Sequence, residues 1–228
     1  SSANAKRSPE RGRLRNSLPN VRTRMTNTGL HSLPWQQMPP EEREREYSPS
    51  SCVGGIYHPF VAAYQTRSAD ARVDCTALGA TWSTRHYGDL AAQQLTLCLP
   101  FNSNELATQP TGLLVFIHGG YWQELSAQDS LFPATDCIQS GLAFAALDYT
   151  LAPAASVADM VAECRRALAW LFQNAKALDV DAARIVVAGS SAGAHLAAMV
   201  ALPGALPDGA GGSFTVRASV LVSGIYAL

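Results

Sequence analysis

The chain has 228 residues, of which 47% are apolar and 15% charged, and its formal net charge is −1 at neutral pH. This length fits one folded domain with a sizeable core, and no apolar run reaches the roughly 18 residues that a membrane-spanning helix needs. No metal-ligand spacing, phosphate-binding loop or nucleic-acid motif stands out. We therefore expect no cofactor, no metal, no nucleic-acid partner and no membrane partner.

The N-terminal part of the chain differs in charge from the rest. Residues 1–24 carry seven Lys or Arg and a single glutamate, and they lack the apolar stretch of a secretory signal. A transit peptide or a nucleic-acid-binding arm are alternatives, but we favour Met25 as the native start, with residues 1–24 non-native. We predict that residues 1–46 form a polar, disordered tail ending in a short solvated helix, and that 47–228 form a partial folded domain.

From residue 93 onward, strand and helix patterns alternate. Continuous apolar runs and three- and four-residue apolar steps predict strands at 93–99, 113–117, 142–148, 185–188 and 216–222, and helices at 126–140, 156–177 and 192–202. Ser126 is a suitable N-cap for the first of these helices, and Gly141 a suitable C-terminus. Such alternation predicts the α/β class: a mostly parallel, doubly wound sheet covered by helices on both faces.

Five cysteines are scattered along the chain without the spacing of a metal site. Cys98, Cys137 and Cys164 lie within apolar segments, as small core residues do. The pattern disfavours a secreted disulfide framework and predicts a reducing, cytoplasmic environment.

Residues 189–193 form a G-x-S-x-G pentapeptide with Ser191 at its centre. A predicted strand precedes it and a predicted helix follows it, which is the context of a nucleophile elbow. The glycines suit a turn that is too sharp for neighbouring side chains. The alternative interpretation is a glycine-rich strand end with a buried serine, and we favour Ser191 as a catalytic nucleophile.

A second motif, His118 to Trp122, follows the predicted strand 113–117. Acyl-transfer enzymes stabilise an oxyanion with backbone amides, which in this architecture come from the residue after the nucleophile and from an upstream loop. We therefore predict an oxyanion hole made by the amides of Gly119, Gly120, Tyr121 and Ala192. The two aromatic residues of the motif either line a pocket or pack under the loop.

Two stretches, HGGYW at 118–122 and GSSAGAHL at 189–196, resemble the esterase and lipase group of the α/β-hydrolases. Within that group the chain is most similar to the arylformamidase (kynurenine formamidase) branch, because Trp122 replaces a third glycine. Further similar stretches are YSPS at 47–50, YG at 87–88, QL at 94–95, LP at 99–100, DYTLAP at 148–153 and SGIY at 223–226. The resemblance extends over roughly residues 35–228.

The resemblance implies an α/β-hydrolase fold and a small-molecule acyl substrate attacked by Ser191. For an arylformamidase the reaction is hydrolysis of N-formyl-L-kynurenine to kynurenine and formate, a step of tryptophan catabolism. A carboxylesterase acting on small esters remains an alternative. The resemblance indicates no cofactor and no particular oligomeric state.

The chain departs from the family in its catalytic acid and base. In α/β-hydrolases these follow the serine, in that order. After Ser191 the chain offers only Asp208, which is too early for the acid, and His195, which lies one turn along the same helix and matches a histidine that is not the base. We therefore expect a chain that lacks the last strands of its sheet, with the acid and base beyond Leu228, and that is nearly inactive.

Residues before Ser191 are poor substitutes for the acid and the base. Asp148 precedes the serine, and the resemblance implies that it braces the segment 149–153. The earlier histidines are expected to be structural or solvent-facing: His31 in the polar tail, His58 and His86 in loops before the core sheet, and His118 at the start of the oxyanion motif.

A non-catalytic binding protein with a hydrolase fold is the second functional hypothesis, although two intact motifs argue against it. A sheet without its edge strands would expose backbone and apolar surface, so we also expect poor solubility.

Overall fold

The computed structural model describes residues 37–228 except for 102–109, 205, 207, 210–211 and 227–228. The chain divides into two compact units, Ser1–Gly54 and Gly55–Leu228. The helices are α1 (Pro40–Tyr47), α2 (His58–Ala77), α3 (Ala134–Gln139), α4 (Val157–Asn174) and α5 (Ala192–Ala201), with short 3₁₀ turns η2 (Pro49–Val53), η3 (Ala127–Ser130) and η4 (Ala175–Leu178). The strands are β1 (Thr81–His86), β2 (Gln94–Leu99), β3 (Thr111–Ile117), β4 (Ala143–Leu147), β5 (Val180–Ser190), β6 (Asp208–Gly209), β7 (Gly212–Ser213) and β8 (Ala218–Val222).

The main sheet has six strands in the order β1-β2-β4-β3-β5-β8. Strands β4, β3, β5 and β8 run parallel, whereas β2 is antiparallel to β4, and β1 is antiparallel to β2. The parallel strands are joined by helices, as expected for crossover connections. The prediction of an α/β-hydrolase fold with a mostly parallel sheet is therefore confirmed.

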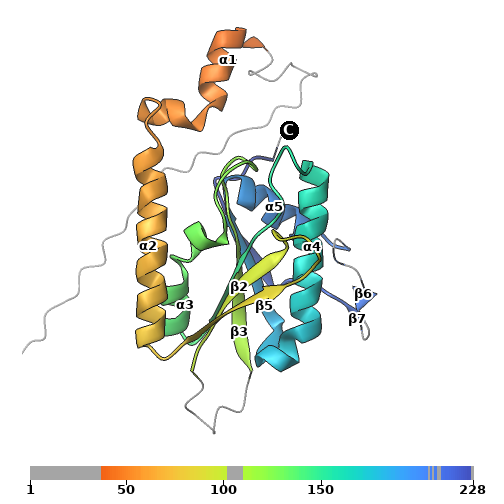
Figure 1. The fold of residues 1–228 in the computed structure, drawn as a ribbon. Coiled ribbons are helices and arrows are strands. Elements are labelled where there is room, and N and C mark those ends of the chain that lie inside the picture. Colours follow the sequence, from red (N-terminus) through yellow and green to blue (C-terminus); the bar gives the residue numbers. More distant parts are fainter. Residues whose placement is uncertain (1–36, 102–109, 205, 207, 210–211, 227–228) are drawn as a thin grey trace, which may run out of the picture. The chain divides into compact units, whose positions relative to one another are not determined.

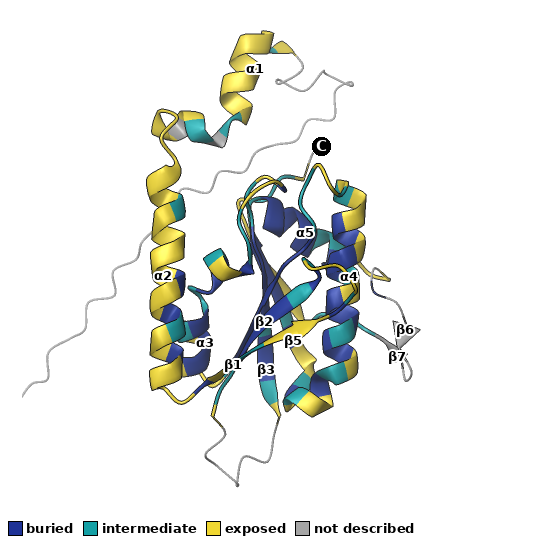
Figure 2. Ribbon diagram, in the orientation of Figure 1, coloured by how far each residue is buried: buried dark blue, intermediate teal, exposed yellow. Residues whose placement is uncertain are grey.

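Helices cover the two faces of this sheet (Figure 1). Successive residues of a strand point to opposite faces. In β3, Val115 joins a core formed with α4 and α5, while its neighbour Phe116 joins a second core with α2 and α3. The central strands are accordingly the most buried part of the second unit (Figure 2).

The long helix α2 and the strand β1 were not predicted from the sequence. Helix α2 buries only Ser68, Ala71 and Cys75, so it has no continuous apolar stripe that would reveal it. The expectation that His58 and His86 lie in loops is wrong, because His58 begins α2 and His86 ends β1.

The predicted helix over 126–140 is also wrong as a single element. It is divided into η3 and α3, and Pro133 stands immediately before α3. Proline lacks the amide proton that a continuous helix would use and its ring clashes with the preceding turn. Ser126 does stand at the N-cap position, before η3, but its hydroxyl donates to the Asp129 carboxylate (2.7 Å) and makes no capping hydrogen bond to the backbone.

Other sequence signals correspond to the observed local structure. Ser156 and Asp159 form a reciprocal capping box at the start of α4. Gly141 adopts φ +70° directly after the helical segment, as a helix-ending glycine does. Four cysteines, Cys75, Cys98, Cys137 and Cys164, are free and buried, as the core interpretation predicted for the last three.

In the first unit, α1 is fully solvated and buries no residue, which confirms the predicted short helix. The predicted disordered tail, including His31 and residues 1–24, lies mostly outside the described residues. Among the helices that the structure describes, none is long and apolar enough to cross a membrane.

Candidate active site

The candidate nucleophile stands at the junction of β5 and α5. β5 ends at Ser190, α5 begins at Ala192, and Ser191 between them has φ +55° and ψ −121°. A serine rarely adopts positive φ, and such backbone strain is concentrated at functional sites. The Ser191 amide donates to the carbonyl of Val222 at 2.8 Å, which fixes the turn to the end of β8.

The two glycines of the pentapeptide are required by close backbone contacts. A Cβ on Gly189 would overlap the carbonyl of Gly193, and a Cβ on Gly193 would overlap the carbonyls of Ile117 and His118. The first turn of α5 therefore packs directly against the end of β3. This contact brings the candidate nucleophile next to the loop that follows β3.

We call residues His118–Leu125 the 118–125 loop. A Cβ on Gly119 would lie 2.8 Å from the Ser190 carbonyl and 3.4 Å from the Ser191 Cβ, so the loop runs against the turn. Gly120 has φ +94°, and its carbonyl accepts from the amides of Gln123 and Glu124, both at 2.9 Å. The fold therefore brings together the two segments singled out in the sequence, 118–122 and 189–193.

The 118–125 loop is fixed by the segment that follows β4. The Tyr149 hydroxyl donates to the carbonyl of His118 at 3.1 Å, and the Tyr149 ring stacks on the His118 imidazole with centroids 4.3 Å apart. The Ala152 amide donates to the Trp122 carbonyl at 2.8 Å. The DYTLAP stretch therefore supports the loop beside Ser191, which the sequence did not indicate.

The aromatic residues of the loop differ in environment. Trp122 is buried, with its ring edge-on to His195 at 5.5 Å, whereas Tyr121 is 51% exposed. Of the two alternatives left open by the sequence, Trp122 packs beneath the loop, and Tyr121 faces solvent. Within the described residues the indole nitrogen of Trp122 has no hydrogen-bond partner.

Asp148 holds a different element from the one expected. Its carboxylate accepts from the Ala127 amide at 2.6 Å and from the Gln94 side chain at 3.2 Å, which fixes the start of η3 and the adjoining strand. The His118 Nε2 lies 3.7 Å from the Asp148 Oδ1. Burial raises the pKa of Asp148 and lowers that of His118, so burial disfavours the ionised form of each group.

The segment 149–153 is instead braced by Glu163, which sequence reasoning missed. The Glu163 carboxylate accepts from the Thr150 amide at 2.7 Å, the Thr150 hydroxyl at 3.0 Å and the Gln93 side chain at 2.8 Å. The available signal was a charged residue on the apolar face of α4, next to Cys164. Charged residues are rarely buried unless they are paired or hydrogen-bonded.

In the part of the chain that the structure describes, no histidine hydrogen-bonds to the Ser191 hydroxyl. The His118 Nδ1 lies 2.8 Å from the Gly119 carbonyl, and His195 is buried against Trp122 with its Nδ1 unpaired. Burial lowers the pKa of His195. Asp208 lies in the short β6–β7 ladder. Neither the His118 nor the His195 imidazole therefore contacts the Ser191 hydroxyl as a catalytic base would.

Several backbone amides around Ser191 are not engaged in hydrogen bonds with other described residues, unlike the amides within the neighbouring helices and strands. The amides of Gly120, Tyr121 and Ala192 donate a hydrogen bond to no other described residue, while the Ala194 amide donates to the Ser191 carbonyl at 3.0 Å. In the described part of the chain, no group of His, Cys, Asp or Glu side chains is placed to hold a metal ion.

Comparison with known proteins agrees with this architecture. The BD-FAE family model matches residues 99–219, more than half of the chain. The kynurenine formamidase of Danio rerio is 31% identical over 199 residues, which cover 85% of this chain and 63% of that protein. The chain therefore spans about three-fifths of the length of this relative.

Solved structures give the same result. A candidate thioesterase from Silicibacter sp. superposes with a TM-score of 0.62 at 26% identity, over 78% of this chain and 62% of the other. An esterase from Thermogutta terrifontis superposes with a TM-score of 0.52 at 28% identity, over 60% of this chain and 51% of the other. From its fold, its strand-to-helix turn at Ser191 and these similarities, the chain belongs to the BD-FAE family of α/β-hydrolases.

Proposed function

We propose that the protein is a serine hydrolase in which Ser191 attacks the carbonyl carbon of a small acyl substrate. The observation that carries this proposal is the strained backbone of Ser191, at φ +55° between β5 and α5, with Gly119 packed against its Cβ. A nucleophile elbow requires this combination of strand, strained serine and helix.

The proposed oxyanion donors are the amides of Gly119, Gly120, Tyr121 and Ala192. Ala192 begins α5, where the first amides of a helix lack intrahelical acceptors and the helix dipole favours negative charge. Gly119 and its neighbours are held by the Tyr149 hydroxyl. A loop fixed in this way needs little reorganisation when charge develops on the substrate oxygen.

The proposed chemistry is acyl transfer in two steps. The Ser191 oxygen forms a bond to the acyl carbon and gives its proton to a base, and the bond from that carbon to the leaving nitrogen or oxygen breaks as the leaving group takes a proton. Water then attacks the acyl-serine and releases the acid. No described histidine hydrogen-bonds to Ser191, so the proposal assigns neither the base nor the acid among the described residues.

Two substrate classes follow from the relatives. The Danio rerio relative is a kynurenine formamidase, which supports N-formyl-L-kynurenine with formate as the released acid. The Thermogutta terrifontis protein is an esterase, which supports small carboxylic esters. Comparing turnover of N-formyl-L-kynurenine and 4-nitrophenyl acetate separates them, because ester turnover without formamide turnover contradicts the formamidase assignment.

Covalent labelling tests the nucleophile directly. The Thermogutta terrifontis esterase is known in a form phosphorylated by paraoxon. We expect paraoxon to add a diethyl phosphate to Ser191 of this protein, slowly because no described base contacts the hydroxyl, with 4-nitrophenolate released. Intact-mass and peptide mass spectrometry locate the adduct.

Two matched variants make the labelling specific. Ser191→Ala should abolish the adduct, and Ser190→Ala, which removes the neighbouring hydroxyl, should retain it. Labelling that is absent from the unaltered protein, or that persists in Ser191→Ala, contradicts the assignment and favours a non-catalytic binding protein.

A further inference from the structure

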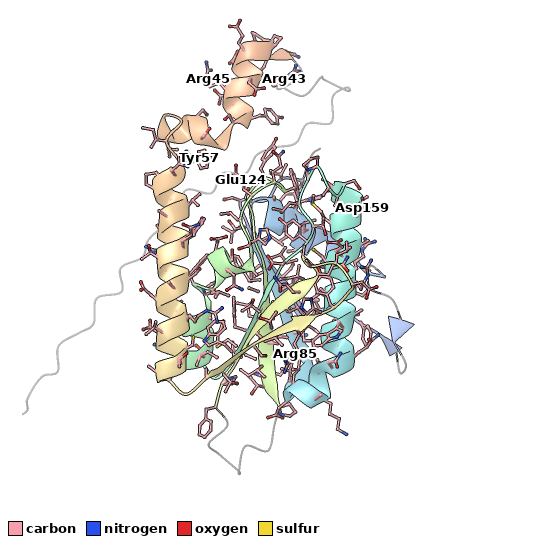
Figure 3. All side chains as sticks on the ribbon, in the orientation of Figure 1. Arg43, Arg45, Tyr57, Arg85, Glu124 and Asp159 are labelled. Carbon is pink, nitrogen blue, oxygen red and sulfur yellow. The ribbon has the colours of Figure 1, made fainter. Side chains whose placement is uncertain are left out.

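The start of α2 meets the 118–125 loop through one side-chain contact. The Tyr57 hydroxyl lies 3.5 Å from Glu124 Oε1, and Figure 3 labels the two residues near each other at the start of α2. The backbone of Glu124 belongs to the turn closed on the Gly120 carbonyl, and Gly119 in the same loop packs against Ser191. Glu124 therefore belongs to the loop whose first residues pack against the candidate nucleophile.

The carboxylate of Glu124 is not neutralised within the part of the chain that the structure describes. It forms no ion pair with a described residue, and it accepts one long hydrogen bond, from the Tyr57 hydroxyl. The residue is exposed, so it can reach a molecule that approaches the loop. A fixed, unpaired negative charge at this position favours a cation.

The surface beside Glu124 is aromatic. Tyr57, Phe60 and Tyr64 recur at three- and four-residue steps, which places them on one side of α2, and they are 36%, 56% and 38% exposed. The Tyr64 ring stacks on Phe132, with centroids 5.3 Å apart. We call Tyr57, Phe60 and Tyr64 the aromatic stripe.

The aromatic stripe continues a face of α2 that is buried farther along the helix. Ser68 and Cys75 carry this face into the core, and Ser68 accepts from the Leu131 amide at 2.9 Å. Among the described residues, the second half of this face is therefore covered, whereas in the first half Tyr64 is partly covered by Phe132 and Tyr57 and Phe60 remain exposed.

We propose that the aromatic stripe and Glu124 form a leaving-group subsite for an aromatic ring that carries an aliphatic ammonium group. Aromatic faces attract cations, and a carboxylate supplies a charge-assisted acceptor for an ammonium group. This inference rests on the proposed function, since Ser191 defines where the acyl bond lies. N-formyl-L-kynurenine has both an aromatic ring and an ammonium group.

A second copy of the chain is a less suitable occupant of this surface. A two-fold interface places the same patch on both partners. Centred on Glu124, it would bring two carboxylates without counter-ions together, which is costly in a desolvated contact.

The test measures binding to the full chain, so that it does not depend on turnover. The probes are kynuramine, an aminophenyl ketone with an aliphatic ammonium group, and 2-aminoacetophenone, the ring ketone without that group. Isothermal titration calorimetry should show that kynuramine binds more tightly. Glu124→Gln should weaken kynuramine binding about fivefold and leave 2-aminoacetophenone unchanged, as expected for loss of a partly exposed charge contact.

Two further variants separate the ring contact from the charge contact. Tyr57→Ala should weaken both probes, because it removes an aromatic face. Asp70→Asn removes one negative charge from an exposed position of α2, about 20 Å along the helix from Tyr57, and should change neither. Equal effects of Glu124→Gln on both probes, no preference for kynuramine, or no binding of either probe overturns the subsite.

This outcome can be told apart from failure of the proposed function. Paraoxon labelling of Ser191 without a Glu124-dependent preference for kynuramine rejects only the subsite. Selective kynuramine binding in a protein whose Ser191 is never labelled rejects the hydrolase proposal, and the surface is then a binding site rather than a leaving-group subsite.

Discussion

Strands β4 and β8 have the same length and similar apolar content, yet they differ completely in burial. Every residue of β4 (AFAAL) is buried, and every residue of β8 (ASVLV) is exposed. β4 lies between β2 and β3 with helices on both faces, whereas β8, among the described strands, pairs only with β5 at the sheet edge. Neighbouring elements, rather than the residues of a strand, therefore decide how much of it is buried.

The difference matters for the candidate site because Ser191 lies between the two regions. On the buried side, the Tyr149 hydroxyl holds the 118–125 loop that packs against Ser191. On the exposed side, the Val222 carbonyl accepts from the Ser191 amide. The support on the β8 side rests on backbone hydrogen bonds, since Val220, Leu221 and Val222 are 51%, 40% and 50% exposed.

The largest predicted effect comes from placing the same charge in each strand. Ala145→Asp puts an unpaired carboxylate at a fully buried position of β4, and we expect a loss of about 4 kcal/mol or more in the free energy of unfolding. Val220→Asp in the exposed strand should change it by about 0.5 kcal/mol or less. Urea unfolding followed by circular dichroism measures both, and similar losses would contradict the comparison.

A smaller effect is expected at the crossing of β3 and α5. Gly193→Ala forces a methyl group into the carbonyls of Ile117 and His118, which cannot move without shifting β3, and should cost about 3 kcal/mol. Gly112→Ala is the matched control, because its new methyl would meet the Leu142 Cδ2 at 3.2 Å, the end of a flexible side chain. Its expected cost is below about 1 kcal/mol, and an equal cost for the two variants would mean that the crossing is not rigid.

The elements around Ser191 could be predicted from the sequence, whereas α2 could not. The glycine–serine turn, the strand 113–117 and the helix after Ser191 each carry a local signal in composition or spacing, and each is present in the structure. By contrast, α2 has little apolar periodicity, because the buried face of its second half is narrow and its aromatic stripe is exposed.

Interactions between distant residues were also beyond the sequence. Glu163 and Thr150 meet because α4 packs beside the end of β4, and Tyr57 and Glu124 meet because α2 begins near the 118–125 loop. No local pattern encodes such a pairing. The exposure of β8 likewise depends on what lies beside it in space.

The pH dependence of the free energy of unfolding tests the burial of His195, which lies in α5 beside the candidate site. Burial lowers the folded-state pKa of His195 below its usual 6.5, so the unfolded chain binds more protons as pH falls below 6.5. This contribution to stability is fully present above pH 6.5 and is lost as pH falls toward the folded pKa. His195→Gln should flatten the dependence by up to about 1.4 kcal/mol per pH unit.

Urea unfolding between pH 5 and pH 8 measures this slope, because that range includes the ordinary pKa of histidine. His86→Gln, which removes an exposed histidine at the end of β1, is the control and should follow the unaltered protein. A slope unchanged by His195→Gln would show that folding does not lower the pKa of this imidazole.

The smallest effect on folding, and the most specific to β8, is expected from Leu221→Lys. The strand presents exposed apolar side chains at a sheet edge that pairs on one side only, and such edges associate with other chains. Lysine at an exposed edge position opposes strand pairing and should change the free energy of unfolding by about 0.5 kcal/mol or less. Sedimentation velocity at increasing protein concentration should show self-association of the unaltered protein and less of it in Leu221→Lys. A protein that stays monomeric throughout would mean that exposure of β8 does not lead to association, and the contrast with β4 would then be one of burial alone.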